Sequence, residues 1–235
     1  MKTNLPAIID GFTGKNIMVV GDILADIYLE GNISRISREA PVLVLEQSKQ
    51  TLVPGGAGNV VNNTATLGGK VFAVGVIGQD APGDEMVQVL TAKSVNHNGL
   101  YRDPLRPTIT KTRIIAGGSA TVRQQVVRID KELKQPLSEN HLLSEITSKL
   151  PQMDAVIMSD YGSGSLTPTV RTKVIELCQT HNIPSIVDSR YNVLDFIGIT
   201  FVKQNEAELA AAVGYPLPEE PTLIKAGFEL KSGLD

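Results

Sequence analysis

The feature that most constrains the fold is a repeated alternation of continuous apolar runs with longer segments of helical periodicity. Continuous apolar runs are typical of strands buried on both faces, and a helix between successive strands makes those strands parallel. The sequence therefore predicts an α/β fold with a doubly wound, mostly parallel sheet. The expected strands are 16–22, 71–77, 155–158, 183–187 and 200–202, and the expected helices are 58–67, 83–93, 138–150, 168–180, 206–213 and 222–230.

Other stretches have apolar residues only at alternate positions. One is 40–46, and another is the pair 109–116 and 121–129, which Gly117-Gly118-Ser119 joins as in a hairpin. Strands with one exposed face do not suit a sheet that helices cover on both sides. We therefore expect a single domain over 1–235 with a small projecting β-sheet, or lid, built from segments 31–49 and 107–130.

Charge and cysteine content limit the partners and the compartment. The chain has 22 basic and 25 acidic side chains, a net charge of -3 that is too small to attract the whole molecule to a polyanion. Cys178 is the single cysteine, which excludes an intrachain disulfide and fits a reducing compartment. With no apolar stretch long enough for a signal or membrane span, we expect a cytoplasmic protein without nucleic-acid or membrane partners.

A glycine cluster, Pro54-Gly55-Gly56-Ala57-Gly58-Asn59, opens one expected helix. Glycines allow close backbone approach, and the free N–H groups of a helix start attract an oxygen-rich ligand. A tight turn without a ligand is the alternative. A dinucleotide fingerprint would follow the first strand directly, whereas this cluster lies more than thirty residues later, which disfavours a dehydrogenase.

An acidic residue, Asp22, ends the first expected strand, and Asp26 follows four residues later. Ligands of open α/β sheets bind outside the carboxyl ends of the strands, so a carboxylate there can accept hydrogen bonds from sugar hydroxyls. Aspartate is also common where a strand passes into a loop.

Taken together, Gly21-Asp22, the glycine cluster and Asn205-Glu206-Ala207-Glu208 resemble the ribokinase-like carbohydrate kinases of the PfkB family. More narrowly, four segments are similar to the heptose-7-phosphate kinase domain of bifunctional ADP-heptose synthesis proteins. These segments are 34–42, 107–113, 128–130 and 159–162, and the whole resemblance runs from about 16 to 213.

The resemblance implies a ribokinase-like fold and an ATP-dependent transfer of a phosphoryl group, with Mg²⁺, to the anomeric hydroxyl of heptose 7-phosphate. It also implies a lid that closes over the sugar and joins two copies into a homodimer. The sugar contacts that it implies come from Asp22, Gly55, Gly56, Asn59 and Asp160.

The resemblance also implies that Asn205 and Glu208 organise Mg²⁺ beside the nucleotide phosphates. Amide and carboxylate oxygens suit this hard cation. The same residue types also form an N-cap with an acid in the first helical turn, and the residues alone do not separate the two roles. Asp188 follows the expected strand 183–187 and is our further candidate for the nucleotide side, although it could equally act as a cap.

A phosphorylated sugar needs a cation to hold its phosphate. Lys111 and Arg113 lie two residues apart on an expected lid strand and so share one face of it. They are our phosphate-binding candidates. A solvated pair that protects an edge strand from aggregation is the alternative.

Three departures from the family pattern affect the expected activity. The catalytic base of the family is an aspartate in a Gly-Ala-Gly-Asp segment, and these 235 residues contain no such segment. We therefore assign no catalytic residue, expect the domain to be incomplete at its C-terminus and expect the chain as given not to turn over.

Ser163 and Arg190 each replace a lysine of the heptose kinase pattern, which could indicate a different phosphosugar. The alternatives are another PfkB-type kinase, acting on fructose phosphate or a nucleoside, and a non-catalytic module for sugar binding or dimerisation.

Overall fold

A six-stranded parallel sheet forms the centre of the computed structural model, which describes residues 5–118, 121–133 and 139–235. The strand order is β10-β9-β8-β1-β4-β5, and every neighbouring pair is parallel. This arrangement confirms the expected α/β sheet. The strands are β1 (Asn16–Gly21), β4 (Lys70–Gly78), β5 (Asn96–Asp103), β8 (Ala155–Asp160), β9 (Ser185–Ser189) and β10 (Phe201–Val202).

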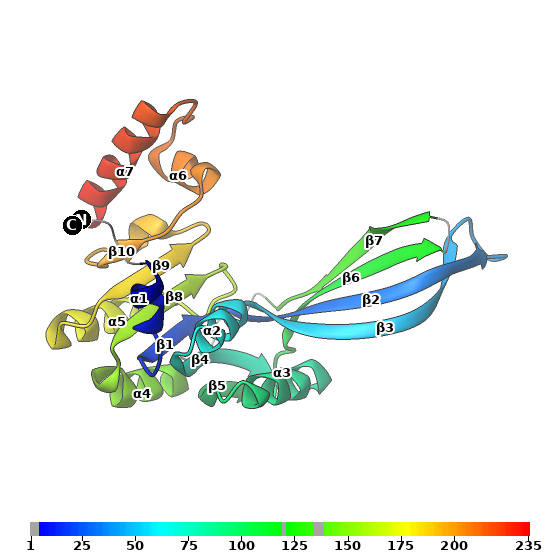
Figure 1. Cartoon of the computed structure of the whole chain (residues 1–235), viewed down its shortest axis with the longest axis horizontal. Coiled ribbons are helices and arrows are strands. Elements are labelled where there is room, and N and C mark those ends of the chain that lie inside the picture. Colours follow the sequence, from blue (N-terminus) through cyan, green and yellow to red (C-terminus); the bar gives the residue numbers. More distant parts are fainter. Residues whose placement is uncertain (1–4, 119–120, 134–138) are drawn as a thin grey trace.

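Helices cover both faces of this sheet (Figure 1), and successive residues of β1 pack against opposite helices. Val19 packs in one core with the helices α2 and α3, while Met18 and Val20 pack in the other with α4 and α5. Both faces are therefore buried, which explains the continuous apolar runs. The covering helices are α2 (Ala57–Thr66), α3 (Ala81–Ala92), α4 (Asn140–Lys149) and α5 (Pro168–His181).

The remaining helices lie nearer the ends of the described chain. The helix α6 (Glu206–Val213) packs against α7 (Glu220–Leu234) through a small apolar cluster that includes Leu209 and Leu230. The short helices are α1 (Leu5–Asp10) and two 3₁₀ turns, η1 (Leu150–Gln152) and η2 (Val193–Asp195). Among the helices that the structure describes, none has both the length and the apolar character that crossing a bilayer requires.

The lid is a four-stranded sheet that projects from the domain as a long arm (Figure 1). Its order is β3-β2-β6-β7, with β2 and β6 parallel and the outer pairs antiparallel. The expected pairing of 109–116 with 121–129 is confirmed, although Ser119 in its turn lies outside the described residues. The strands are β2 (Ile23–Ile36), β3 (Leu43–Gly56), β6 (Ile109–Gly118) and β7 (Thr121–Lys131).

The structure corrects several expected boundaries. The lid strands β2 and β3 reach well beyond 31–49, so Gly55 and Gly56 end a strand instead of lying in a loop. Strand β5 was missed because Asn96-His97-Asn98-Gly99 is polar and looks like a loop in the sequence. Strand β9 begins at Ser185, two residues later than expected, just after Pro184, which has no N–H to donate.

Candidate functional site

A polar cavity of about 400 Å³ lies where the lid meets the sheet domain, between β2, β6 and the start of α2. It brings together five of the residues expected to bind substrate: Gly55, Gly56, Asn59, Lys111 and Arg113. We call this cavity the cleft. Its other polar lining residues are Asp26, Tyr28, Arg128, Tyr161 and Arg190.

The cleft is strongly cationic. Four of its lining residues, Lys111, Arg113, Arg128 and Arg190, carry a positive charge, and Asp26 is the one acidic residue among them. Neither Lys111 nor Arg190 has an ion-pair partner within the part of the chain that the structure describes. Such a set attracts an anion and leaves donors available to it.

Asp26 and Arg113 form an ion pair on the wall of the cleft. The parallel pairing of β2 with β6 places Asp26 opposite Lys111 and Tyr28 opposite Arg113. The Arg113 guanidinium also lies 5.4 Å from the centroid of the Tyr28 ring. The hydrogen bond to Asp26 raises the pKa of Arg113, so this cation stays charged at any physiological pH.

The Tyr161 ring contacts Lys111 and Arg190, the two cleft cations for which the described residues provide no ion pair. Lys111 Nζ lies 5.6 Å and the Arg190 guanidinium 5.2 Å from the centroid of its ring. Each contact falls within the range of a cation–π interaction. Both cations therefore contact one aromatic ring at the edge of the cleft, where their charges would attract an anion.

The structure places Asp22 beneath the cleft and not among its lining residues. This side chain is fully buried, and its carboxylate accepts hydrogen bonds from the backbone N–H groups of Tyr161, Ser163 and Ser165 at 2.8, 3.0 and 3.0 Å. Burial raises the pKa of Asp22, against the opposing effect of these donors. Asp22 therefore holds the 161–165 loop in place, and its expected contact with a sugar stays a prediction.

Asp160 is likewise buried, and its expected contact with a sugar also stays a prediction. It is 4% exposed, and its two oxygens accept hydrogen bonds from Gly162 N at 3.0 Å and Ser189 Oγ at 2.7 Å. Its carbonyl accepts the Arg190 N–H at 3.0 Å. Asp160 therefore fixes the backbone on either side of Tyr161 and Arg190, and it does not line the cleft.

Gly55 and Gly56 form the floor of the cleft, and glycine is needed there because no side chain fits at either position. A Cβ at Gly55 would lie 2.3 Å from Asp26 Oδ2, and one at Gly56 would lie 2.5 Å from the Asp22 carbonyl oxygen. Gly56 also has a φ of 55°, in the left-handed region. The backbone can thus bring the start of α2 and Asn59 against the cleft.

Asn205 and Glu208 form a capping box at the start of α6. Asn205 Oδ1 accepts the Glu208 N–H at 2.8 Å, and Glu208 Oε2 accepts the Asn205 N–H at 2.9 Å. The capping alternative is therefore present in the structure. Glu208 also lines a second cavity of about 310 Å³. Magnesium sites in kinases often use one or two carboxylates together with phosphates and water, which these residues fit.

The two cavities are neighbours, because Arg190 lines both. Asp188, expected on the nucleotide side, lines neither cavity. It pairs instead with Lys203 at 3.0 Å, and the hydrogen bond to Asp188 raises the pKa of Lys203. Within the described residues there is no cluster of three or more metal-ligating side chains.

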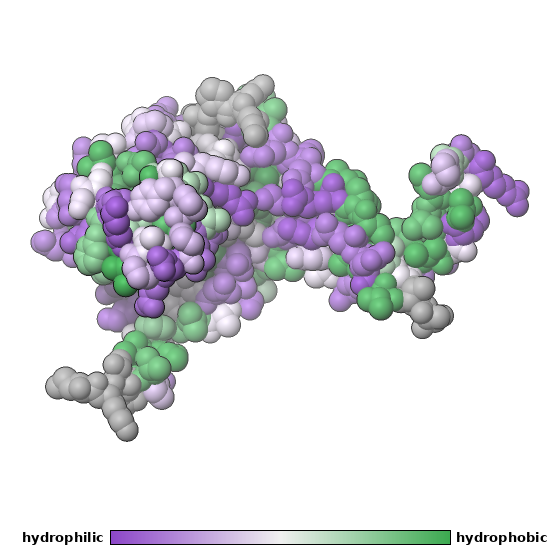
Figure 2. All heavy atoms as spheres, turned by 90° about the horizontal axis from the view of Figure 1, so that it is seen from above, coloured by the Kyte–Doolittle hydropathy of each residue, from purple (hydrophilic) through white to green (hydrophobic). Residues whose placement is uncertain are grey.

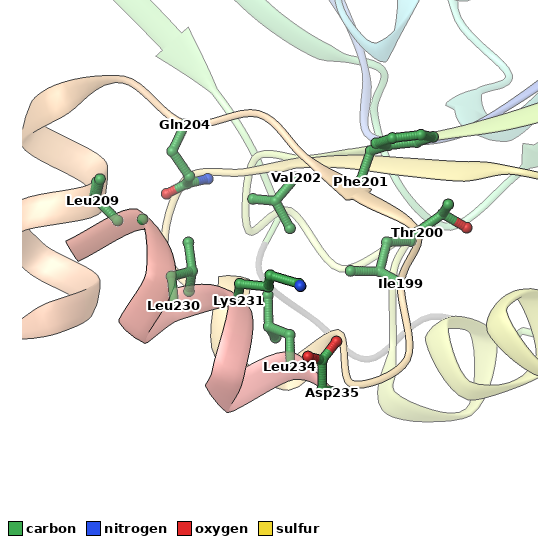
Figure 3. A pocket seen from close by; sticks show the side chains of 11 residues that line it. Ile199, Thr200, Phe201, Val202, Gln204, Leu209, Leu230, Lys231, Leu234 and Asp235 are labelled. Atoms are coloured by element: carbon green, nitrogen blue, oxygen red, sulfur yellow. The ribbon is translucent and has the colours of Figure 1, made fainter. Parts of the chain in front are cut away.

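Another cavity and the single cysteine are the other places where chemistry could occur, and neither suits a polar reaction. The cavity between β10 and α7, of about 380 Å³, is lined chiefly by apolar residues such as Val202, Leu230 and Leu234 (Figure 3). Burial raises the pKa of Cys178 to about 11, so the thiol is protonated and unreactive. The cleft therefore remains the candidate site.

Sequence reasoning missed Asp26, Arg128 and Arg190 as cleft residues. Asp26 had a detectable signal, because Leu24, Asp26 and Tyr28 alternate along what proves to be a strand. Arg128 lies directly opposite Arg113 in the β6–β7 pairing, a register that the sequence did not fix. Arg190 enters the cleft only because its loop is tied to Asp160, which no local pattern indicates.

The chain matches the pfkB family of carbohydrate kinases over residues 15–234. It belongs to this family. The bifunctional protein HldE of Desulfatibacillum aliphaticivorans is 40% identical over 223 residues, which are 93% of this chain and 45% of that protein. HldE of Geobacter metallireducens is 36% identical over 224 residues, or 94% of this chain and 45% of that protein. The chain thus spans less than half the length of these curated relatives.

Solved structures agree on the fold. Arabidopsis thaliana ribokinase complexed with ribose and ATP aligns with a TM-score of 0.66 at 17% identity, covering 94% of this chain and 70% of that one. Escherichia coli phosphofructokinase-2 aligns with a TM-score of 0.64 at 20% identity, covering 94% and 71%. The expected ribokinase-like fold is confirmed.

Proposed function

We propose that this chain forms the acceptor-binding part of an ATP-dependent sugar kinase and that its cleft holds a phosphorylated sugar. The observation that carries the proposal is the composition of the cleft: four cations and one carboxylate at the base of a β lid in a pfkB-family chain. Cationic side chains bind a phosphate through charge-assisted hydrogen bonds, and a carboxylate accepts hydrogen bonds from sugar hydroxyls.

Each end of such a ligand has its own partners. Lys111 and Arg190, which have no ion pair within the described residues, take the phosphate beside Tyr161. Asp26 and Asn59 take sugar hydroxyls at the glycine floor. We propose heptose 7-phosphate as the sugar, because segments 34–42 and 159–162 resemble the heptose kinase pattern and the curated relatives are HldE proteins.

The phosphoryl donor belongs on the side of Arg190 away from the sugar. There Glu208 and Asn205 line or border the second cavity, and we propose that they orient Mg²⁺ and its waters beside the phosphates of ATP. The ion would neutralise charge on the transferred phosphoryl group.

Transfer also needs a general base to accept the proton of the attacking hydroxyl. Asp22, at the end of β1, cannot serve, because it is buried and saturated with backbone hydrogen bonds. Asp26 is already paired with Arg113. Since Gly-Ala-Gly-Asp does not occur in these residues, we propose that the chain binds its acceptor without turning it over.

The lid carries an apolar surface that fits a second copy of the chain. Val122 is 89%, Ile36 67% and Ile129 54% exposed, all on the projecting arm, where Figure 2 shows hydrophobic residues gathered. Exposed apolar clusters of this kind mark interfaces more often than free surface. We propose a homodimer that buries these residues.

A free, buried Cys178 suits a reducing compartment, and we propose the cytoplasm.

Calorimetric titration of the chain with heptose 7-phosphate, fructose 6-phosphate and adenosine tests the proposed function. We expect heptose 7-phosphate to bind most tightly and a coupled assay with Mg²⁺ and ATP to show no ADP release. Preference for fructose 6-phosphate or adenosine would indicate another acceptor, and ADP release that depends on heptose would contradict the proposed lack of turnover. Absence of binding by all three would refute the acceptor site.

A further inference from the structure

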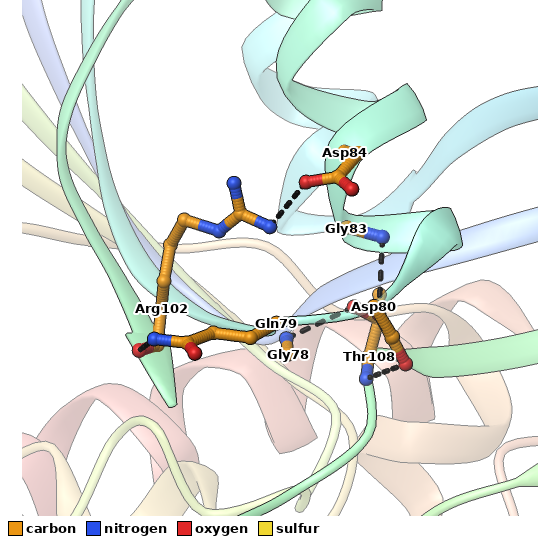
Figure 4. A network of polar contacts seen from close by, with 7 residues as sticks. All are labelled: Gly78, Gln79, Asp80, Gly83, Asp84, Arg102 and Thr108. Atoms are coloured by element: carbon orange, nitrogen blue, oxygen red, sulfur yellow. Dashed lines mark hydrogen bonds and ion pairs between the residues drawn. The ribbon is translucent and has the colours of Figure 1, made fainter. Parts of the chain in front are cut away.

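One carboxylate ties the root of lid strand β6 to the sheet domain. Asp80, the N-cap of α3, accepts hydrogen bonds from Thr108 Oγ1 at 2.5 Å and from Thr108 N at 3.0 Å (Figure 4). Thr108 Oγ1 in turn accepts the N–H of Gly78, the last residue of β4, at 2.9 Å. Thr108 is fully buried, so its hydroxyl and its N–H depend on protein partners.

The junction is tightly packed as well as hydrogen-bonded. A Cβ at Gly78 would lie 2.5 Å from Thr108 N and 2.7 Å from the Arg106 carbonyl oxygen. The segment that leads into β6 therefore rests directly on the end of a central strand. A contact this close leaves little room for the root of the lid to shift while its hydrogen bonds remain.

Both ends of the β6–β7 hairpin meet at the same carboxylate. Thr108 immediately precedes β6, and Lys131, the last residue of β7, places its Nζ 3.9 Å from Asp80 Oδ2. The cleft cations Lys111 and Arg128 lie only three residues from Thr108 and Lys131. Because a strand moves as a unit over such short lengths, the position of the root sets the position of the cations.

We propose that Asp80 and Thr108 are positioning residues that hold Lys111 and Arg113 in place against the floor of the cleft. Neither residue lines the cleft, so each acts only through the strand that it anchors. The inference rests on the proposed function in one respect, namely that the anion that Lys111 helps to hold is a sugar phosphate.

Three substitutions separate the parts of the junction. Thr108→Val removes the hydroxyl and leaves the buried Gly78 N–H without a partner, whereas Thr108→Ser keeps both hydrogen bonds. Asp80→Asn preserves the helix cap, since asparagine caps as well as aspartate. It replaces the oxygen that accepts the Thr108 N–H with an amide NH₂ group, which can only donate. Asp84→Asn is the matched control, because Asp84 lies on the same helix and, among the described residues, forms its ion pair with Arg102, away from Thr108 (Figure 4).

Two measurements on the full chain test the proposal: hydrogen exchange of the amides of residues 110–113, and calorimetric affinity for heptose 7-phosphate. We expect Thr108→Val and Asp80→Asn to speed exchange at these amides by about 10-fold and to weaken binding by about 10-fold, because small displacements of ligand-binding groups are costly. Thr108→Ser and Asp84→Asn should match the parent chain in both measurements, and circular dichroism should show all four variants folded.

Unchanged exchange in both Thr108→Val and Asp80→Asn would overturn the proposal, as would equal effects in Asp84→Asn. Faster exchange with unchanged affinity would also overturn it, since the cations would then not depend on the junction. If the parent chain fails to bind heptose 7-phosphate, the proposed function fails. In that case the same variants are titrated with inorganic phosphate. Weaker phosphate binding together with faster exchange in Thr108→Val and Asp80→Asn would still support the positioning role, and unchanged phosphate binding or unchanged exchange would overturn it.

Discussion

Asp22 and Asp26 lie four residues apart, yet the first is fully buried beneath the cleft and the second pairs with Arg113 on its wall. The chain turns from β1 into the lid strand β2 between them. Asp22 therefore builds the loop that carries Tyr161, and Asp26 is the carboxylate available to a ligand.

Replacing each aspartate should affect a different property. Asp22→Ala leaves three backbone N–H groups without their acceptor, two of them on buried serines, so we expect the free energy of unfolding to fall by about 3 kcal/mol or more. Asp26→Ala breaks a part-exposed pair and should cost about 1 kcal/mol or less. Chemical denaturation measures both, and a larger loss in Asp26→Ala would contradict the assignment.

Glu208→Gln separates the two roles of the α6 capping box. Glutamine can keep the hydrogen bond to the Asn205 N–H, so we expect a change in unfolding free energy of about 0.5 kcal/mol or less. The negative charge beside the second cavity is lost, so Mg²⁺-dependent binding of tripolyphosphate should weaken by about 10-fold. Glu206→Gln in the same turn is the control for charge. Equal losses in both variants would remove Glu208 from the proposed magnesium site.

Charges introduced on the lid should disrupt the proposed homodimer. Val122→Glu and Ile36→Glu each place a carboxylate on an apolar surface of the arm, so we expect sedimentation velocity to show monomers. Phe228→Glu on α7 is the matched control, because Phe228 is 66% exposed but lies away from the lid. A parent chain that sediments as a monomer, or lid variants that remain dimeric, would contradict this interface.

The junction at Asp80 predicts a pH dependence of stability. Burial acts to raise the pKa of Asp80, but hydrogen bonds from Thr108 and Gly83 and the charge of Lys131 outweigh it, so the pKa is lower than in the unfolded chain. Its contribution is therefore present above the unfolded value of 3.8 and lost as pH falls through the folded value. Melting temperatures of the parent and Asp80→Asn should differ at pH 7 and converge in acid. A difference in melting temperature that stays the same at every pH would contradict the lowered pKa of Asp80.

The sequence predicted those parts of the fold that local patterns encode. Strands buried on both faces and the alternating lid hairpin were recognisable because burial dictates residue type directly. Strand β5 was not, since its polar start at Asn96 resembles a loop. Within the site, Lys111 and Arg113 could be predicted from strand alternation. The separate positions of Asp22 and Asp26 could not, because tertiary packing determines which carboxylate accepts the 161–165 amides.

The most direct measurement compares the affinities of heptose 7-phosphate and unphosphorylated heptose by calorimetry, for the parent chain and for Lys111→Ala, Arg190→Ala and the lid control Arg35→Ala. We predict that the phosphate contributes at least about 10-fold in the parent chain, and that loss of either cleft cation weakens the phosphosugar by about 10- to 100-fold while Arg35→Ala does not. Equal affinity for the two sugars in the parent chain would contradict a phosphosugar cleft.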